Sequence, residues 1–151
     1  MNIAIIDDIS TDAEALKNIA VSYFEKKQIR AEICHFFSAE EFFEDYQPGK
    51  FQILFLDIYM DGANGIEIAR ELRGFDPDCL LIFTTTSTDH ALDGFKVRAL
   101  HYLVKPYNEK EISELMDEVL SRIPDSGKYI DVKVNGSNIQ VPFRSIVFAE
   151  H

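Results

Sequence analysis

The run Ile53-Leu54-Phe55-Leu56-Asp57 sets four consecutive apolar residues directly before a carboxylate. Two similar runs, Ile3-Ala4-Ile5-Ile6 and Leu80-Leu81-Ile82-Phe83, are also continuous rather than alternating. Continuous apolar runs are typical of strands buried on both faces of a parallel sheet. Weaker patterns at residues 31–37 and 99–104 predict two further strands.

Helical patterns separate these runs. Apolar residues recur every three or four positions between Ala13 and Phe24 and between Ile112 and Ile123. Shorter helices are expected at residues 39–46, 65–75 and 89–97. A capping residue with Glu three positions later marks four helix starts, at Thr11, Ser38, Asn64 and Asn108. Strands alternating with helices predict an α/β fold with one doubly wound parallel sheet.

The character of the chain changes after Pro124. Residues 125–128 have the composition of a linker. Alternating residues on either side of Asn135-Gly136 then predict a β-hairpin, and residues 145–148 a further strand. We therefore expect one domain over residues 1–124, a linker over 125–128 and a short β extension over 129–151.

Composition limits the classes of partner. The net charge is −11, from 26 acidic and 15 basic residues, and such a surface repels nucleic acid. No apolar run approaches the roughly 20 residues that span a bilayer, and the first residues do not resemble a signal peptide. Cys34 and Cys79 are expected to be buried free thiols. These features predict a cytoplasmic protein without a membrane partner.

Polar residues follow the predicted strands where each one ends. The first strand ends in Asp7 and Asp8, the third in Asp57, and the fourth in three threonines at residues 84–86. Lys105-Pro106 follows the fifth. Taken singly, each could be a helix cap, a turn residue or an ordinary strand residue. Because ligands bind beyond the carboxyl ends of parallel strands, the group together predicts a site. Its carboxylates suit Mg²⁺, which in turn prepares a site for phosphate oxygens.

At these residues the chain resembles the receiver domain of bacterial two-component response regulators. The matching pieces are Ile5-Ile6-Asp7-Asp8, Leu56-Asp57-Ile58-Tyr59-Met60, Ile82-Phe83-Thr84-Thr85 and Tyr102-Leu103-Val104-Lys105-Pro106, and the likeness covers about residues 2–123. It implies a flavodoxin-like receiver fold, with five parallel strands in the order 2-1-3-4-5. It also implies a cis peptide bond before Pro106.

The resemblance implies a role for each acid. Asp57 is the expected phosphoacceptor, which forms an acyl phosphate. Asp8, the Asp57 carboxylate and the backbone carbonyl of Tyr59 are expected to bind Mg²⁺ or Mn²⁺ directly. Asp7 is expected to act mainly through a metal-bound water.

The resemblance also implies residues that bind the phosphoryl group and residues that change conformation when it is bound. Lys105 and the Thr85 hydroxyl would bind its oxygens. The spacing from Lys105 favours Thr85, and a slip of one residue would name Thr84 or Thr86 instead. Tyr102 would then turn inward as Thr85 moves toward the phosphoryl group.

The partners and output also follow from the resemblance. A sensor histidine kinase would supply the phosphoryl group, and the face of the fourth helix, fifth strand and fifth helix would form a homodimer. Residues 129–151 resemble the opening strands of a LytTR-type DNA-binding domain, so DNA would be bound only through a complete domain. The protein would be a phosphoacceptor switch that controls transcription, with slow self-dephosphorylation at most, rather than an enzyme. Two alternatives stay open: a small Mg²⁺-dependent phosphohydrolase using Asp57, and a degenerate receiver that binds partners without phosphorylation.

Two residues depart from the common receiver pattern. Asp61 stands where receivers often have Pro, and its extra carboxylate could alter Mg²⁺ binding or face solvent. Tyr59 is bulky, and we expect its ring to shield the acyl phosphate from water.

Overall fold

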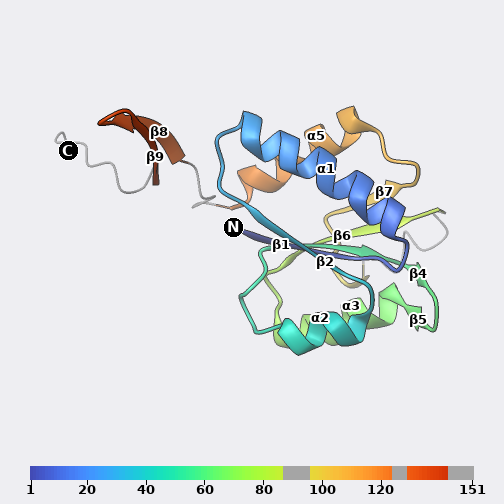
Figure 1. Cartoon of the computed structure of the whole chain (residues 1–151). Coiled ribbons are helices and arrows are strands. Elements are labelled where there is room, and N and C mark those ends of the chain that lie inside the picture. The colour runs from blue at the N-terminus through green and yellow to red at the C-terminus, as the bar shows by residue number, and fades with distance from the viewer. Residues whose placement is uncertain (87–95, 124–128, 143–151) are drawn as a thin grey trace.

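A computed structural model describes residues 1–86, 96–123 and 129–142 of the chain. Strands and helices alternate along most of it (Figure 1). The elements are β1 (Asn2–Ile6), α1 (Ser10–Lys26), β2 (Glu32–Phe36), α2 (Ala39–Asp45), β3 (Ile53–Asp57), β4 (Tyr59–Met60), β5 (Ala63–Asn64), α3 (Gly65–Phe75), β6 (Leu80–Thr85), β7 (His101–Val104), α5 (Glu109–Ser121), β8 (Tyr129–Val134) and β9 (Ser137–Pro142).

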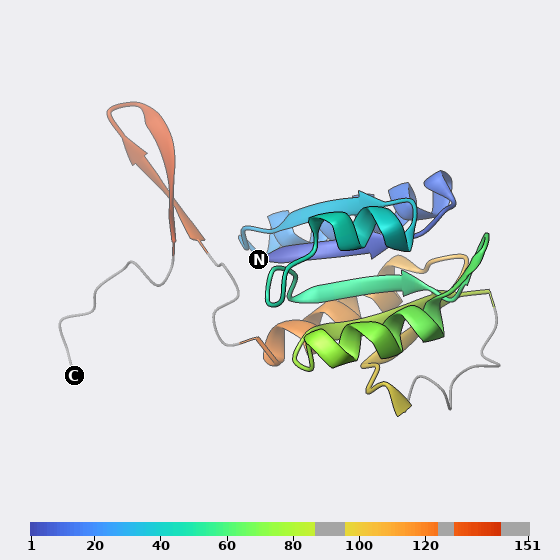
Figure 2. The same ribbon diagram turned by 90° about the horizontal axis from the view of Figure 1, so that it is seen from below.

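The main sheet has five parallel strands in the order β2-β1-β3-β6-β7. This is the expected order 2-1-3-4-5 once the sheet strands alone are counted, so the predicted fold is confirmed. Figure 2 shows the arrowheads of β1, β2 and β3 pointing toward the same end of the sheet, and β6 and β7 run in the same direction because they pair in parallel with their neighbours. The residues that follow the strands therefore gather at one edge.

Helices cover both faces of the sheet, with α1 and α5 on one face and α2 and α3 on the other (Figure 1). Strand residues alternate between the two faces. Ile5, Phe55 and Ile82 pack under α1 and α5, whereas Ile6, Leu56 and Phe83 pack against α2 and α3. The central strand β3 is buried along its whole length, which explains its uninterrupted apolar sequence.

Three of the four predicted helix caps are correct. The side chains of Ser38, Asn64 and Asn108 each accept a backbone hydrogen bond from the first turn of α2, α3 or α5. The cap predicted at Thr11 is wrong, because α1 begins at Ser10 and its N-cap position, Ile9, makes no side-chain cap bond. The Ile9 N–H instead donates to Asp7 Oδ1 at 2.9 Å, so an acid of the strand end fixes the entry into α1.

Two small antiparallel hairpins accompany the main sheet. Strands β4 and β5 pair immediately after β3. Strands β8 and β9 pair across Asn135-Gly136, and both turn residues have positive φ, as the predicted hairpin requires. The predicted linker at 125–128, the strand at 145–148 and most of the helix predicted at 89–97 lie outside the described residues.

The two cysteines differ in burial. Cys79 is buried, as expected, but Cys34 is only partly buried because it lies on the edge strand β2. Within the described residues, no helix is both long enough and apolar enough to cross a bilayer.

Candidate functional site: an acidic pocket at the carboxyl edge of the sheet

Three carboxylates meet where β1 and β3 end. Asp7 and Asp8 follow β1, Asp57 closes β3, and one oxygen from each lies within 4.8 Å of the others. Asp7 is only 1% exposed and Asp57 only 2%. Carboxylates held this close and this deep repel one another, so the pocket favours a bound cation.

Lys105 is the cation that the chain itself supplies. Its Nζ lies 3.0 Å from Asp7 Oδ2, 3.3 Å from Asp57 Oδ2 and 2.8 Å from Asp12 Oδ2. Burial alone would lower the pKa of Lys105, but hydrogen bonds to Asp12 and Asp7 and the charge of Asp57 raise it. The side chain therefore stays charged.

Sequence analysis missed Asp12. This residue lies in the first turn of α1, and its carboxylate reaches over the edge of the sheet to Lys105. Its position four residues after Asp8 was the available signal, because the first turn of a helix that follows a strand lies beside the end of that strand.

The environment of Asp57 favours its protonated form. Burial, reinforced by the charge of Asp7, raises the pKa of Asp57 to about 6, against the opposing effects of Lys105 and of the Tyr59 N–H. That N–H donates to Asp57 Oδ1 at 3.2 Å. An added cation would remove the repulsion and favour the carboxylate.

Within the described residues, one of the two Asp8 carboxylate oxygens accepts a hydrogen bond and the other does not. Its Oδ2 accepts a hydrogen bond from the backbone N–H of Asp61 at 2.8 Å. Its Oδ1 is buried and has no hydrogen-bond partner within the described part of the chain. An oxygen-only donor set with an unsatisfied buried carboxylate oxygen and excess negative charge fits Mg²⁺.

The three threonines differ in position. Thr84 lies opposite Asp57 and Thr85 opposite Val104, and both are buried, whereas Thr86 is exposed. Because side chains alternate along a strand, Thr85 shares a face of the sheet with Phe83.

Tyr102 and Pro106 lie on either side of Lys105 in the sequence. The ring of Tyr102 packs against Phe83, with 5.4 Å between centroids, and so lies on the same face as Thr85. The Lys105–Pro106 peptide bond is cis.

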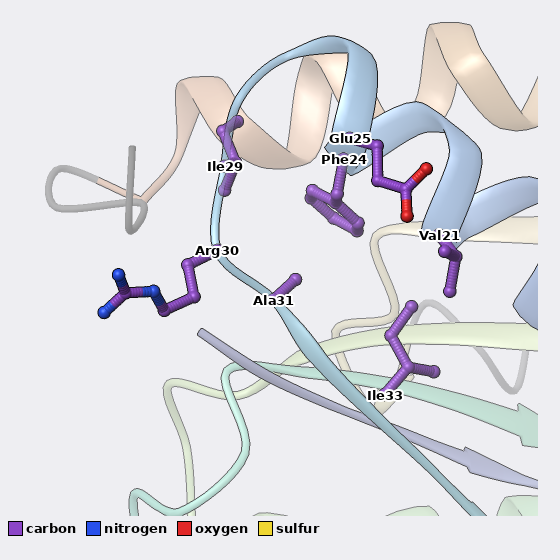
Figure 3. Close-up of a pocket in the computed structure, with 7 residues that line it drawn as sticks. All are labelled: Val21, Phe24, Glu25, Ile29, Arg30, Ala31 and Ile33. Atoms are coloured by element: carbon purple, nitrogen blue, oxygen red, sulfur yellow. The ribbon is translucent and has the colours of Figure 1, made fainter. Parts of the chain in front are cut away.

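A separate hollow of about 190 Å³ lies between the C-terminal half of α1 and the start of β2 (Figure 3). Apolar residues such as Phe24 and Ile33 line it, and the Arg30 side chain extends away from them. Because it lies where β2 begins, it is at the opposite edge of the sheet from the acids.

The fold and the pocket together define an α/β protein with a cluster of three carboxylates and a lysine at the carboxyl edge of its parallel sheet. The family model for the response regulator receiver domain matches residues 3–117. The chain belongs to this family.

Curated relatives agree with this assignment. The sensory transduction protein LytT of Bacillus subtilis is 31% identical over 117 residues, which are 77% of this chain and 46% of that protein. The positive alginate biosynthesis regulatory protein of Pseudomonas aeruginosa is 24% identical, over all of this chain and 66% of that one. The chain spans less than half the length of the LytT proteins that it matches.

Solved structures are similar in fold. The response regulatory domain of mrkE from Klebsiella pneumoniae has a TM-score of 0.70 at 23% identity, covering 80% of this chain and 96% of that one. The response regulator TrrA of Thermotoga maritima, solved in complex with Mg(2+)-BeF, has a TM-score of 0.65 at 27% identity, covering 78% and 97%.

Proposed function

We propose that Asp57 accepts a phosphoryl group from a sensor histidine kinase in the cytoplasm, in a Mg²⁺-dependent reaction. The observation that carries this proposal is the position of Asp57. It is buried at a strand end, within reach of two further carboxylates and 3.3 Å from the Lys105 ammonium. Phosphoryl transfer depends mainly on positioning and charge neutralisation, and this pocket offers both.

In the proposed reaction, an Asp57 oxygen attacks phosphorus while the P–N bond of the phosphohistidine breaks, and the histidine nitrogen keeps the electron pair. Asp8, Asp57 and the Tyr59 carbonyl would hold Mg²⁺, with Asp7 acting through a bound water, and the ion supplies charge neutralisation. Lys105, already paired with Asp57, is in place to bind a phosphoryl oxygen.

The signal would leave the site through Thr85 and Tyr102. Both lie on the same face of the sheet, and Phe83 packs against the Tyr102 ring. Movement of the Thr85 hydroxyl toward the phosphoryl group would open space for that ring. The resulting change on β7 and α5, together with the fourth helix, would promote a homodimer.

The output would lie beyond the receiver. We propose a receiver over residues 1–124, a linker over 125–128 and the beginning of a LytTR-type DNA-binding domain over 129–151. The β8–β9 hairpin and the LytT relatives support this division. A complete output domain would bind DNA and control transcription.

Acetyl phosphate with Mg²⁺ tests the proposed function. We expect intact-protein mass spectrometry to find about one stable phosphoryl group per chain, and none when EDTA is present or Asp57 is replaced by Asn. Continuous release of inorganic phosphate at many turnovers would favour a phosphohydrolase instead. Absence of both label and turnover would favour a degenerate receiver.

Replacing Tyr59 should shorten the lifetime of the acyl phosphate. The residue lies two positions after Asp57, its backbone N–H donates to the Asp57 carboxylate, and its side chain is exposed. Removing the ring admits water, so Tyr59→Asn should lose phosphate on the order of several-fold faster. Tyr59→Phe keeps the ring and should match the wild type. Mass spectrometry over time measures the rate at which each protein loses its phosphoryl group. Equal rates for the wild type and both variants would show that the Tyr59 ring does not protect the acyl phosphate.

A further inference from the structure

The β4–β5 hairpin contacts the acidic pocket through its backbone. Met60 pairs with Ala63, so the turn consists of Asp61 and Gly62, and Gly62 has a φ of 74°. The Asp61 N–H points out of this turn to Asp8 Oδ2 at 2.8 Å. This is a contact between residues 53 positions apart in the chain, and it joins the hairpin to the end of β1.

We propose that the backbone N–H of Asp61 is a positioning group that orients Asp8 for Mg²⁺. This inference rests on the proposed function of the pocket as a magnesium site. A carboxylate rotates about its last bond, and a donor bonded to one oxygen fixes that rotation. Here the donor holds Oδ2, and Oδ1 remains buried without a partner among the described residues. Oδ1 is therefore the oxygen kept for the ion.

The side chain of Asp61 does not make this contact. Asp61 is exposed, and the donor is its main-chain nitrogen. Any residue except proline supplies the same N–H. In this chain a proline at position 61 would therefore remove the contact with Asp8, and any other residue would keep it.

Substitution by proline removes the N–H with little change to the turn. A positive φ at the second turn residue is typical of a type II turn, which favours Pro at the first. The preceding residue, Met60, lies in a strand, the conformation that a following proline prefers. Asp61→Pro should therefore fold, and Asp61→Asn is its matched control because it removes the charge and keeps the N–H.

Calorimetric titration of the whole chain with MgCl₂, without a phosphodonor, tests the proposal. Outer groups that orient a metal ligand typically change affinity 10- to 100-fold, so Asp61→Pro should bind Mg²⁺ about tenfold more weakly. Asp61→Asn should stay within about threefold of the wild type, since an exposed charge is screened. At saturating Mg²⁺, the phosphorylation rate of Asp61→Pro should recover. Equal affinity in wild type and Asp61→Pro, or equal weakening in both variants, would overturn the proposal.

Amide NMR gives a second measurement that does not depend on the proline variant. The Asp61 amide proton should resonate downfield in the wild type without metal, and it should move upfield in Asp8→Ala. An Asp61 amide proton whose chemical shift is the same in Asp8→Ala as in the wild type would also overturn the proposal. A wild-type chain that binds no Mg²⁺ would instead contradict the proposed function itself, so the two failures are distinguishable.

Discussion

Gly65→Ala is expected to destabilise the protein by at least about 3 kcal/mol, at the upper end of the cost of overpacking a well-packed interior. Gly65 is the first residue of α3, and its N–H donates to the Ile58 carbonyl at 2.9 Å. A Cβ atom there would lie 2.3 Å from the Asp57 carbonyl oxygen and 2.9 Å from Ile58 Cα. Both neighbours are backbone atoms, so relief requires the end of β3 to move, and Asp57 with it.

Gly74→Ala is the matched control within the same helix. Apart from its chain neighbours and the backbone of α3 itself, no atom of the described residues lies within 4 Å of the Cβ that this substitution would add. Because alanine favours helix over glycine, Gly74→Ala should be neutral or stabilising by up to about 1 kcal/mol. Urea unfolding monitored by circular dichroism gives the free energy of unfolding of the Gly65→Ala and Gly74→Ala variants. A Gly65→Ala midpoint equal to that of the wild type would contradict the close packing of α3 against β3.

Asp57→Asn is expected to be more stable than the wild type above about pH 7 in EDTA, by about 3 kcal/mol, since the pKa of Asp57 rises from 3.8 to about 6 and one pKa unit corresponds to about 1.4 kcal/mol. The pocket raises the pKa of Asp57 from 3.8 to about 6. The folded state therefore holds the proton more tightly than the unfolded chain. Stability falls as the pH rises between these two values, and above the higher one the full cost of the charged carboxylate is present. Asparagine carries no charge and avoids that cost.

Thermal unfolding at several pH values checks both the sign and the pH dependence. The advantage of Asp57→Asn should shrink as the pH falls from about 7 to about 5. Mg²⁺ should reverse the order, because an ion that binds the folded wild type stabilises it by mass action and the variant lacks one ligand. A stability difference between Asp57→Asn and the wild type that does not depend on pH would contradict the proposed electrostatics of the pocket. An Asp57→Asn variant less stable than the wild type in EDTA would contradict it as well.

The sheet could be predicted because its signal is local. The apolar run before Asp57 is continuous because β3 is covered on both faces, and burial of that kind selects residue types directly. The convergence of Asp7, Asp8, Asp57 and Lys105 followed from topology, since the carboxyl ends of parallel strands share one edge.

The contacts that refine the pocket could not be predicted in this way. Asp12 reaches Lys105 from the helix that follows β1, and its residue type alone suits any exposed first turn. The Asp61 contact uses a main-chain N–H, which every residue but proline has. The wrong cap prediction at Thr11 has a similar origin. The Ile9 N–H donates to Asp7, which lies at the end of the preceding strand, and a local capping motif does not include that residue.

The central claim is that Asp57 itself carries the phosphoryl group, and borohydride trapping tests it most directly. Borohydride reduces an aspartyl phosphate to homoserine, which peptide mass spectrometry can locate by residue. After reaction with acetyl phosphate and Mg²⁺, we expect homoserine at residue 57 and at no other aspartate, including residues 7, 8, 12 and 61. Homoserine at any of those positions, or an unchanged residue 57 in a chain that carries the label, would contradict the account.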